Sequence, residues 1–406
     1  MSRKIVVSLF CGAGGLDLGF EAAGFEIAVA IDNNEKVLEI YQNNFPGTTV
    51  LCRDIFKLTA REIRETINNR YSDWDGEIAA VIGGPPCQGF SIAGKQDVND
   101  ERSKLVIKFI DLVTQLNPSI FVMENVPAIE SKKFEDITGN ATALIQERYM
   151  LSKWLLTASD YGVPQKRQRV IWVGSKFDVV SPPSLCNQRF TVGDAIADLA
   201  GIPINSEVDV WDLQVKGEYA RLLEKTFLNP SAVAGNEING CRATSHSIAT
   251  INKYANTVPG TKELTTWAYR LFEKGFSPTL RAGSGNRTAA RPIHYEQARV
   301  ITVREAARLH SYPDWFDFGE TKLNAHKAIG NSVPPLLAYA IAQAVMQHLE
   351  CNIENKTYGG LFLLSNCLLL RDLYSASYHK KYFDSLLAIE EAKSNRTRKL
   401  RMVRLL

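Results

Sequence analysis

Short apolar runs alternate with glycine- or proline-rich turns along the first half of the chain. Residues 4–10, 26–32 and 77–82 form apolar runs of the length expected for buried strands. The first run passes directly into a glycine loop that opens into a predicted helix, residues 11–25. The late run LLAYAIAQAVMQHL predicts a helix that closes the sheet. Strands that alternate with helices in this way predict an α/β fold.

Polar residues at the ends of these strands predict a nucleotide-like cofactor site. The spacing of the loop glycines departs from GxGxxG, although they would equally let the backbone approach a ligand. Asp32 ends its strand about 20 residues further on, where such folds bind a ribose hydroxyl. Asp54 ends another short run. Each acid alone would fit a helix cap or a solvated loop end. In series after successive strands they outline an adenosyl pocket.

The stretch GGPPCQGFS, residues 83–91, presents one cysteine, Cys87, behind two prolines. Prolines fix φ and lack a backbone donor, so this turn cannot continue as a helix or a central strand. The cysteine therefore falls at the carboxyl end of a predicted strand, where open α/β sheets bind ligands. A helix that begins after this loop would favour the reactive thiolate. A small core cysteine is the alternative interpretation.

The third residue of the Pro-Pro-Cys sequence bears on the reaction class. Methyltransferases that act on exocyclic amino groups carry an aromatic residue at this position, where it stacks on the target base. An amino group is nucleophilic enough to take a methyl directly. Cytosine C5 is not, and it needs covalent attack at C6 first. A cysteine at position 87 therefore indicates methylation of carbon.

Six segments in a fixed order resemble the motifs of the bacterial cytosine-C5 DNA methyltransferase family. The resemblance covers about residues 1 to 345 and leaves a long variable stretch in the middle. It implies a Rossmann-like S-adenosylmethionine-dependent methyltransferase domain with a smaller target-recognition domain. The matching segments are FCGAGGLDLGF, GGPPCQGFS, FVMENV, QKRQRV, TVREAARLHSYP and IGNSVPP.

The resemblance implies a catalytic set and a cofactor site. Cys87 would attack cytosine C6, and Glu124 would hold N3 and the exocyclic amine. Arg167 and Arg169 would lie near the base and its phosphate. A solvated acid and a basic surface turn are the alternatives for these residues. Asp32 would bind the ribose of S-adenosylmethionine and Asp54 its adenine. The full cofactor-binding set would be Phe10, Gly12, Gly14, Gly15, Leu16, Asp32, Asp54, Ile55, Pro86, Asn331 and Ser332.

The family's chemistry also implies contacts to DNA. A stacked cytosine cannot be approached from above its ring, so the base must flip out of the duplex. Residues 88–105 resemble the family's mobile loop, which closes over the flipped base. An ordinary solvated loop is the alternative. The DNA-binding residues implied are Gln88, Ser91, Lys95, Arg102, Gln165 and Thr279.

Composition adds little to this picture. The net charge of +3 is too small to indicate a nucleic-acid partner by itself. Residues 270–308 hold eight Lys or Arg against three acids, which fits either a phosphate-binding passage or a solvated basic face. Seven cysteines without CxxC spacing argue against a disulfide framework and a zinc site, and they indicate a reducing, cytoplasmic compartment. We therefore expect no metal. We also expect no membrane segment, because the apolar run 361–370 is only half as long as a membrane span.

Four regions follow from this interpretation. Residues 1–175 would form the catalytic and cofactor-binding domain, 176–300 the target-recognition domain, and 301–350 a return segment that completes the catalytic domain. Residues 351–406 are a C-terminal extension with a basic tail, which we interpret as solvated rather than DNA-contacting.

The leading hypothesis is a DNA (cytosine-5)-methyltransferase, monomeric, acting on double-stranded DNA within a restriction-modification system. Its cognate endonuclease would act independently. An RNA methyltransferase of the related tRNA-acting branch is a second hypothesis, against which the long variable region and the missing Cys-Phe-Thr signature weigh. A non-catalytic DNA-binding relative is a third. It fits poorly, because Cys87, Glu124, Arg167 and Arg169 are all present.

Overall fold

The computed structural model describes residues 3–86, 104–227, 237–281, 291–319 and 321–357, the last five of these by backbone alone. Predictions for Cys87, Gln88, Ser91, Lys95 and Arg102 lie outside the described residues, as do those for the tail beyond residue 357. The residues described up to Gln347 form one compact unit, and those from His348 onward belong to another.

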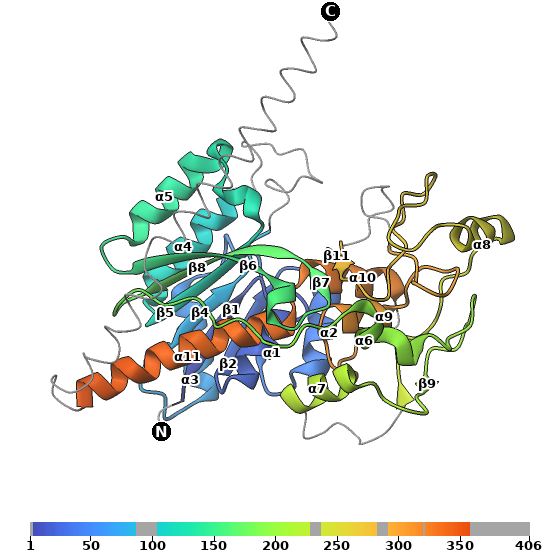
Figure 1. Cartoon of the computed structure of the whole chain (residues 1–406). Helices are drawn as coiled ribbons and strands as arrows, with labels where there is room; N and C mark the ends of the chain where they lie inside the picture. The colour runs from blue at the N-terminus through green and yellow to red at the C-terminus, as the bar shows by residue number, and fades with distance from the viewer. Residues whose placement is uncertain (1–2, 87–103, 228–236, 282–290, 320, 358–406) are drawn as a thin grey trace, which may run out of the picture. The chain divides into compact units, whose positions relative to one another are not determined.

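A seven-stranded sheet forms the centre of the first unit, in the order β3-β2-β1-β4-β5-β8-β6 (Figure 1). Neighbouring strands from β3 to β5 pair in parallel, whereas β8 is antiparallel to both β5 and β6. The strands are β1 Ile5–Leu9, β2 Glu26–Asp32, β3 Thr49–Cys52, β4 Ala80–Gly83, β5 Ile120–Asn125, β6 Met150–Thr157 and β8 Gln168–Ser175. The predicted α/β fold is confirmed.

The strand order reverses between β1 and β4, because β2 and β3 lie on one side of β1 and the later strands lie on the other. In open α/β sheets, ligands bind at such a switch point, outside the carboxyl ends of the strands. The loops after β1 and β4 are the predicted glycine loop and the segment that leads to Cys87. The topology thus brings two sequence-distant motifs to one edge of the sheet.

Helices cover the sheet. Contacts join α3 (Ala60–Arg70) to α4 (Lys104–Leu116) and α4 to α5 (Glu135–Ile145), and Figure 1 shows α4 and α5 side by side. The helix α1 (Gly15–Ala22) packs closely on the first part of α11 (Pro335–Thr357), where a Cβ at Gly19 would lie 2.4 Å from the backbone nitrogen of Tyr339. The late helix expected from the sequence is therefore present.

Between Ser175 and α11, the described residues form short elements rather than a second large sheet. The strand β11 pairs in parallel with β7, and β10 pairs with β9. The helix α6 contacts α9, and α9 contacts α10, which in turn contacts α2 (Glu35–Asn44). These elements are β7 Gln165–Lys166, α6 Val192–Ile196, β9 Trp211–Asp212, α7 Glu218–Thr226, β10 Glu237–Ile238, α8 Ile248–Ala255, β11 Ser277–Pro278, α9 Val303–Leu309 and α10 Lys322–Asn331, with short 3-10 turns at Pro127–Glu130, Lys132–Phe134, Ala158–Tyr161 and Ala197–Leu199.

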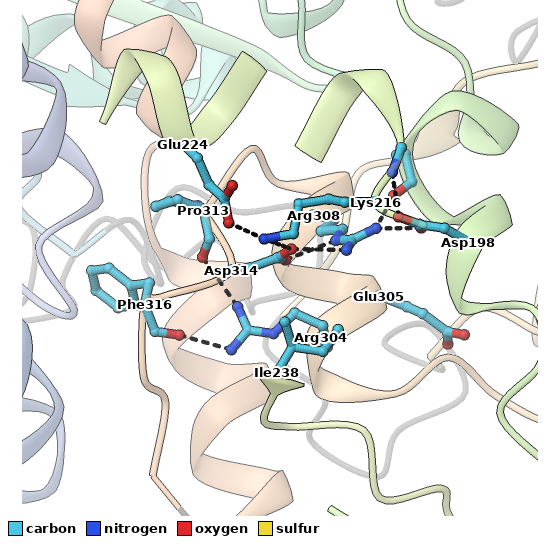
Figure 2. Close-up of polar contacts among 12 residues, drawn as sticks. Asp198, Lys216, Glu224, Ile238, Arg304, Glu305, Arg308, Pro313, Asp314 and Phe316 are labelled. Atoms are coloured by element: carbon cyan, nitrogen blue, oxygen red, sulfur yellow. Dashed lines mark hydrogen bonds and ion pairs between the residues drawn. The ribbon is translucent and has the colours of Figure 1, made fainter. Parts of the chain in front are cut away.

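The helix α9 lies within the TVREAARLHSYP segment, residues 302–313, and it carries buried charges. Thr302 and Glu305 form a capping box at its start, which explains why the helix begins there. Figure 2 shows the Arg308 guanidinium between Asp314 and Asp198. Its Nε and Nη2 atoms donate to Asp314 at 2.8 Å each. Buried charges are tolerated only when they are paired in this way, so the network fixes α9 against the segment around residue 198.

Arg304 is also a buried arginine of α9, and its hydrogen-bond partners are mainly backbone carbonyls. Its guanidinium donates to the carbonyls of Asn239, Pro313 and Phe316 at 2.9 to 3.1 Å. The two arginines of one helix therefore tie together segments around residues 198, 239 and 314.

Among the described residues, no helix is long and apolar enough to cross a membrane. The described cysteines are free thiols: Cys11, Cys52, Cys186, Cys241 and Cys351. No group of three or more His, Cys, Asp or Glu side chains in the described part of the chain could hold a metal ion.

Candidate active site

The loop after β1 has the backbone that its glycines permit. Gly12 and Gly14 have φ angles of 55° and 84°, in the left-handed region that favours glycine. A Cβ at Gly14 would lie 2.3 Å from the Phe45 ring, and one at Gly15 would lie 2.3 Å from the carbonyl oxygen of Val333. A Cβ at Gly12 would meet no described atom within 4 Å. The loop thus packs tightly at Gly14 and Gly15, whereas its backbone at Gly12 is open to the approach of a ligand.

Asp32 lies at the carboxyl end of β2 and faces this loop. Its carboxylate accepts hydrogen bonds from the backbone nitrogens of Gly12 at 3.1 Å and Asn34 at 3.0 Å. Burial raises the pKa of Asp32, while these two hydrogen bonds oppose the rise. A carboxylate has about four acceptor sites, so Asp32 can still accept hydrogen bonds from the hydroxyl groups of a ligand.

Asp54 follows β3, the strand beside β2. The nitrogen of Arg53 donates to the carbonyl of Asp32 at 3.0 Å, so the two strand ends lie together. Asp54 is exposed and accepts from the nitrogen of Phe56 at 3.0 Å, whereas Ile55 is buried. The structure therefore brings both predicted acids to the same edge of the sheet.

The IGNSVPP segment, residues 329–335 and here called the late cofactor motif, lies against the glycine loop. The helix α10 ends at Asn331, which is exposed, and a Cβ at Gly15 would be 3.1 Å from the Cβ of Ser332. Phe10 and Pro86 are half-buried at the ends of β1 and of the loop after β4, and Leu16 is buried in α1. The predicted cofactor residues thus come from five separate parts of the sequence that meet at one edge.

Glu124 lies at the end of β5 beside the segment that leads to Cys87. A Cβ at Gly84 would be 3.0 Å from Oε2 of Glu124, and the side chain of Asn125 donates to the carbonyl of Pro85 at 3.3 Å. Arg169 on β8 forms an ion pair with Oε1 of Glu124, and both side chains are largely buried. A carboxylate and a guanidinium are thus held together beside Gly84, which precedes Cys87 by three residues in the sequence.

Arg167 does not lie where the sequence predicted. Its guanidinium donates to the carbonyls of Leu280, Gly330 and Ser332 at 2.9 to 3.1 Å, and the side chain is 1% exposed. A guanidinium committed to three buried carbonyls cannot also bind a base or its phosphate. The prediction for Arg167 is therefore corrected: it holds the late cofactor motif and the segment after β11 in place.

Gln165 needs the same correction. Its side-chain amide donates to the carbonyl of Leu309 at 3.1 Å and accepts from the nitrogen of Leu280 at 3.0 Å. The residue is fully buried, so a direct DNA contact does not fit. Thr279, in contrast, is partly exposed, and its hydroxyl donates to the carbonyl of Lys166 at 2.8 Å. Its DNA contact stays a prediction.

His310 is a residue of this framework that the sequence analysis did not single out. One ring nitrogen lies 3.0 Å from the carbonyl of Ser332, and the other lies 3.0 Å from the Gln165 amide. Burial, with the charge of Arg167, holds the pKa of His310 well below its usual value, so the ring is neutral. The HSYP sequence drew attention only as part of the TVREAARLHSYP segment. A histidine there gave no signal of its own, because its partners lie 22 and 145 residues away.

Asp17, on α1 behind the glycine loop, is fully buried. Burial raises its pKa to about 7, and the Ser8 hydroxyl offsets this only in part. The pKa of this carboxyl is higher in the folded state than in the unfolded state, where it is about 4. Its contribution to the free energy of unfolding is therefore greatest below pH 4 and is lost as the pH rises towards 7.

We therefore expect Asp17→Asn to be more stable than the wild type at pH 8, with a difference that shrinks by pH 5. The upper limit is about 4 kcal/mol. Urea unfolding of both chains across this pH range would measure it. The exposed Glu21 is present in both chains, so its own titration largely cancels in the difference. A difference that does not vary with pH would contradict the assignment.

An open sheet with one reversed strand, a glycine loop and acids at successive strand ends defines an α/β methyltransferase of the S-adenosylmethionine-dependent type. The family model for C-5 cytosine-specific DNA methylase matches residues 5–347. The chain belongs to this family and is a DNA (cytosine-5)-methyltransferase.

Individual relatives agree with this assignment. The chain is 37% identical over 372 residues to the type II methyltransferase M.XorII of Xanthomonas oryzae pv. oryzae, with 86% of each chain covered. It is 33% identical over 352 residues to the type II methyltransferase M1.HphI of Haemophilus parahaemolyticus, covering 84% of this chain and 86% of the relative. Among solved structures, a candidate DNA modification methyltransferase encoded within an E. coli prophage is 33% identical, with a TM-score of 0.73, covering 85% of this chain and 99% of that one.

Proposed function

We propose that this enzyme transfers a methyl group from S-adenosylmethionine to C5 of a flipped cytosine within a specific duplex sequence, through a covalent bond between Cys87 and C6. The observation that carries the proposal is the position of Glu124. Its carboxylate is paired with Arg169 and lies beside Gly84, three residues before the nucleophile in the sequence. An acid held at the end of a central strand next to a nucleophile loop fits a group that binds the reacting base.

The residues at the switch point fit an adenosyl cofactor. Asp32 retains acceptor sites for ribose hydroxyls, the exposed Asp54 can accept from an adenine amino group, and the backbone at Gly12 is open to close approach. When bound, S-adenosylmethionine supplies an electrophilic methyl group on a positively charged sulfur. Asn331 and Ser332 would complete this site beside Gly15.

The proposed steps follow from the two catalytic side chains. The Cys87 thiolate adds to C6 and forms a carbon–sulfur bond, and the electron pair of the C5–C6 double bond moves to C5. Glu124 holds N3 and the exocyclic amine, which favours a proton at N3 during this addition. The electron-rich C5 would then form a bond to the methyl group, whose bond to the cofactor sulfur breaks and leaves its electron pair on that sulfur. A base removes the C5 proton, the double bond forms again, and the carbon–sulfur bond breaks.

Arg169 would act on this sequence of steps through Glu124. Its pairing with Oε1 fixes the direction of the carboxylate and leaves Oε2 towards the loop of Gly84. Arg167 and Gln165 would contribute indirectly, because they hold Ser332 and the segment after β11 against the catalytic edge. Residues 176–300 would supply the target recognition.

The names of the similar type II methyltransferases support a place in a restriction-modification system. In such a system, the enzyme methylates the duplex sequence that a separate endonuclease cuts. Expression of the chain in a host followed by bisulfite sequencing of its DNA would give the methylated sequence. Transfer of labelled methyl groups to this duplex rather than to tRNA would distinguish the DNA from the RNA assignment.

With that sequence known, a duplex carrying 5-fluorocytosine at the target is expected to become covalently attached to Cys87 in the presence of cofactor. Fluorine at C5 cannot leave as a proton does, so the enzyme stays trapped after methyl transfer. Denaturing electrophoresis would detect the complex, and peptide mapping would locate the bond. An adduct on another cysteine, or none with the cognate duplex, would refute the covalent step.

A further inference from the structure

Asp17 is a buried acid at the start of α1, the helix into which the glycine loop opens. It is the third residue of this helix, and it is fully buried. Helical side chains lean towards the N-terminal end, so the carboxylate lies over the first turn, behind the loop. Burial raises the pKa of Asp17 and the nearby Ser8 hydroxyl opposes the rise, yet neither carboxylate oxygen has a partner with hydrogen-bond geometry among the described residues. A buried acid in this state opposes folding, which indicates a role other than packing.

Two tyrosines line the back of the loop. A Cβ at Gly14 would lie 2.9 Å from the Tyr41 ring, and one at Gly15 would lie 2.5 Å from the Tyr312 hydroxyl. Both tyrosines are fully buried, and their hydroxyl oxygens also lack a hydrogen-bond partner in the described part of the chain. A charge shielded from solvent in this way is screened much less than one in water. The charge of Asp17 can therefore act across the loop.

The effect of this charge extends into the loop itself. Burial raises the pKa of the Cys11 thiol, and the charges of Asp32 and Asp17 add to the rise. Burial likewise raises the pKa of Tyr312, with a further contribution from Asp17. Asp32, which accepts from the nitrogen of Gly12, and Asp17, behind the loop, thus place negative charge on two sides of the loop backbone.

This arrangement changes what the start of α1 can bind. A helix N-terminus carries about half a positive charge and exposes backbone N–H groups, so it ordinarily binds anions such as nucleotide phosphates. In dinucleotide-binding folds the pyrophosphate lies at this point. In α1, the N-cap Gly14 has no capping side chain, and an ionised Asp17 adds a full negative charge in the first turn. The balance at the loop is then negative, which favours a cationic ligand.

We propose that the carboxylate of Asp17 sets the ligand selectivity of the glycine loop: it offsets the positive end of α1, so that the loop favours the sulfonium S-adenosylmethionine over its uncharged thioether product, S-adenosylhomocysteine, and over phosphorylated adenine nucleotides. The inference rests on the proposed function. Substrate and product share the adenosine, amino and carboxyl groups, and they differ in the methyl group and the charge on sulfur. Asp17 acts on the ligand through its charge rather than by contact. The preference would also favour release of the product, because methyl transfer removes the charge.

Asp17→Asn tests the proposal, because it keeps the shape of the side chain and removes its charge. At pH 8 we expect it to weaken the binding of S-adenosylmethionine about tenfold and to leave the binding of S-adenosylhomocysteine unchanged. Isothermal titration calorimetry without DNA measures both dissociation constants. Asp136→Asn is the matched control: Asp136 is exposed in the first turn of α5, where solvent screens its charge, so both constants should equal those of the wild type. Tyr41→Phe removes a buried hydroxyl behind the loop but keeps the charge, so the ratio of the two constants should not change.

The pair of ligands separates the effect of charge from a change of structure. A loop distorted by the substitution would bind both ligands more weakly by the same factor, because they differ only at the sulfur. An equal loss for both ligands, or no loss for S-adenosylmethionine, would overturn the inference. Competition with ADP tests the other side of the selectivity. Asp17→Asn should bind ADP about tenfold more tightly than the wild type, and unchanged binding would refute the part of the proposal that concerns phosphates.

The pH dependence of the selectivity is a second measurement. Burial raises the pKa of Asp17 to about 7, so its charge appears as the pH rises through 7. The preference of the wild type for S-adenosylmethionine over S-adenosylhomocysteine should therefore grow from pH 6 to pH 8, whereas that of Asp17→Asn should grow less. The amino group of the ligand is common to both compounds and cancels in the ratio. The other titratable groups near Asp17, all present in both chains, are Cys11, Tyr41, Tyr312, Asp32 and Glu21. Profiles of the same shape in both chains would overturn the inference.

Binding of these ligands needs neither DNA nor methyl transfer, which keeps the test apart from the proposed chemistry. A chain that binds S-adenosylmethionine selectively through Asp17 but methylates no cytosine would count against the proposed function alone. Equal dissociation constants for the wild type and Asp17→Asn would overturn the inference about Asp17 while leaving the chemistry intact.

Discussion

Replacing Cys87 by alanine is expected to abolish methyl transfer while keeping the binding of cognate duplex and cofactor. The thiol acts only after the base has flipped, and it adds little to the phosphate and groove contacts that hold the DNA. Methyl transfer from labelled cofactor measures the loss, and gel shift or anisotropy measures the retained binding. A Cys87→Ala chain that lost binding of cognate DNA would indicate a structural role for the thiol instead.

Glu124→Gln is the matched comparison, since it keeps the size and one hydrogen-bonding oxygen but loses the charge. Loss of a general acid-base group typically slows a reaction about 10²- to 10⁴-fold, so some transfer should remain. The change also removes the ion pair with Arg169. The order of the two variants decides the mechanism: if Cys87→Ala were as active as Glu124→Gln, covalent catalysis by Cys87 would have to be abandoned.

The sequence was most informative where strands end in short motifs. From the sequence, a glycine loop after β1 and an acid after β2 are predicted to lie close together. The reason is that neighbouring parallel strands bring their carboxyl ends to one edge of the sheet. The sheet order and the packing of Gly15 on Val333 then confirm that the first and last cofactor motifs meet. Motif order alone could not show this, since 318 residues separate the two partners.

The two arginines of the QKRQRV segment, Arg167 and Arg169, show what a local sequence pattern could not predict. Arg167 and Arg169 are alike in sequence, yet one donates to three buried carbonyls and the other pairs with Glu124. The carbonyls that bind Arg167 come from residues 280, 330 and 332, which no local pattern connects to it. Charge does not reveal whether an arginine faces a ligand or the interior.

The basic passage 270–308 makes the same point. It was expected to follow a phosphate backbone or to form a solvated face. Among its described residues, Arg270, Arg299, Arg304 and Arg308 are buried and use their guanidinium groups on internal carbonyls and carboxylates. Residues 282–290 of this passage lie outside the described residues.

Arg308→Met is expected to cost about 3 to 5 kcal/mol of folding stability, because it leaves the buried carboxylates of Asp314 and Asp198 without their main partner (Figure 2). Urea unfolding of the full chain at pH 7 measures the loss. Arg61→Met is the control. It breaks the exposed pair with Glu65 and should change stability little, since solvent already screens that pair.

The pH dependence of this loss identifies its origin. Burial alone would raise the pKa of Asp314, but Arg308 holds it below its usual value. A carboxylate with a lowered folded pKa stabilises the wild type above the unfolded pKa of about 4, and this contribution is lost as pH falls through the folded value. In Arg308→Met, burial favours the protonated form of Asp314. Lowering the pH therefore raises the free energy of unfolding of the variant, whereas it lowers that of the wild type. The difference between the two chains should therefore narrow from pH 7 to pH 4.

A chain that also carries Asp198→Asn and Asp314→Asn should regain part of the lost stability, because no unpaired buried charge remains. Equal unfolding midpoints for Arg308→Met and Arg61→Met would mean that the buried network is not what holds α9. Because the network joins α9 to the segment that carries Asp198, a folded Arg308→Met chain should also show a higher KM for DNA with little change in the KM for cofactor. A rise confined to the cofactor KM would instead place the effect of Arg308 at the glycine loop.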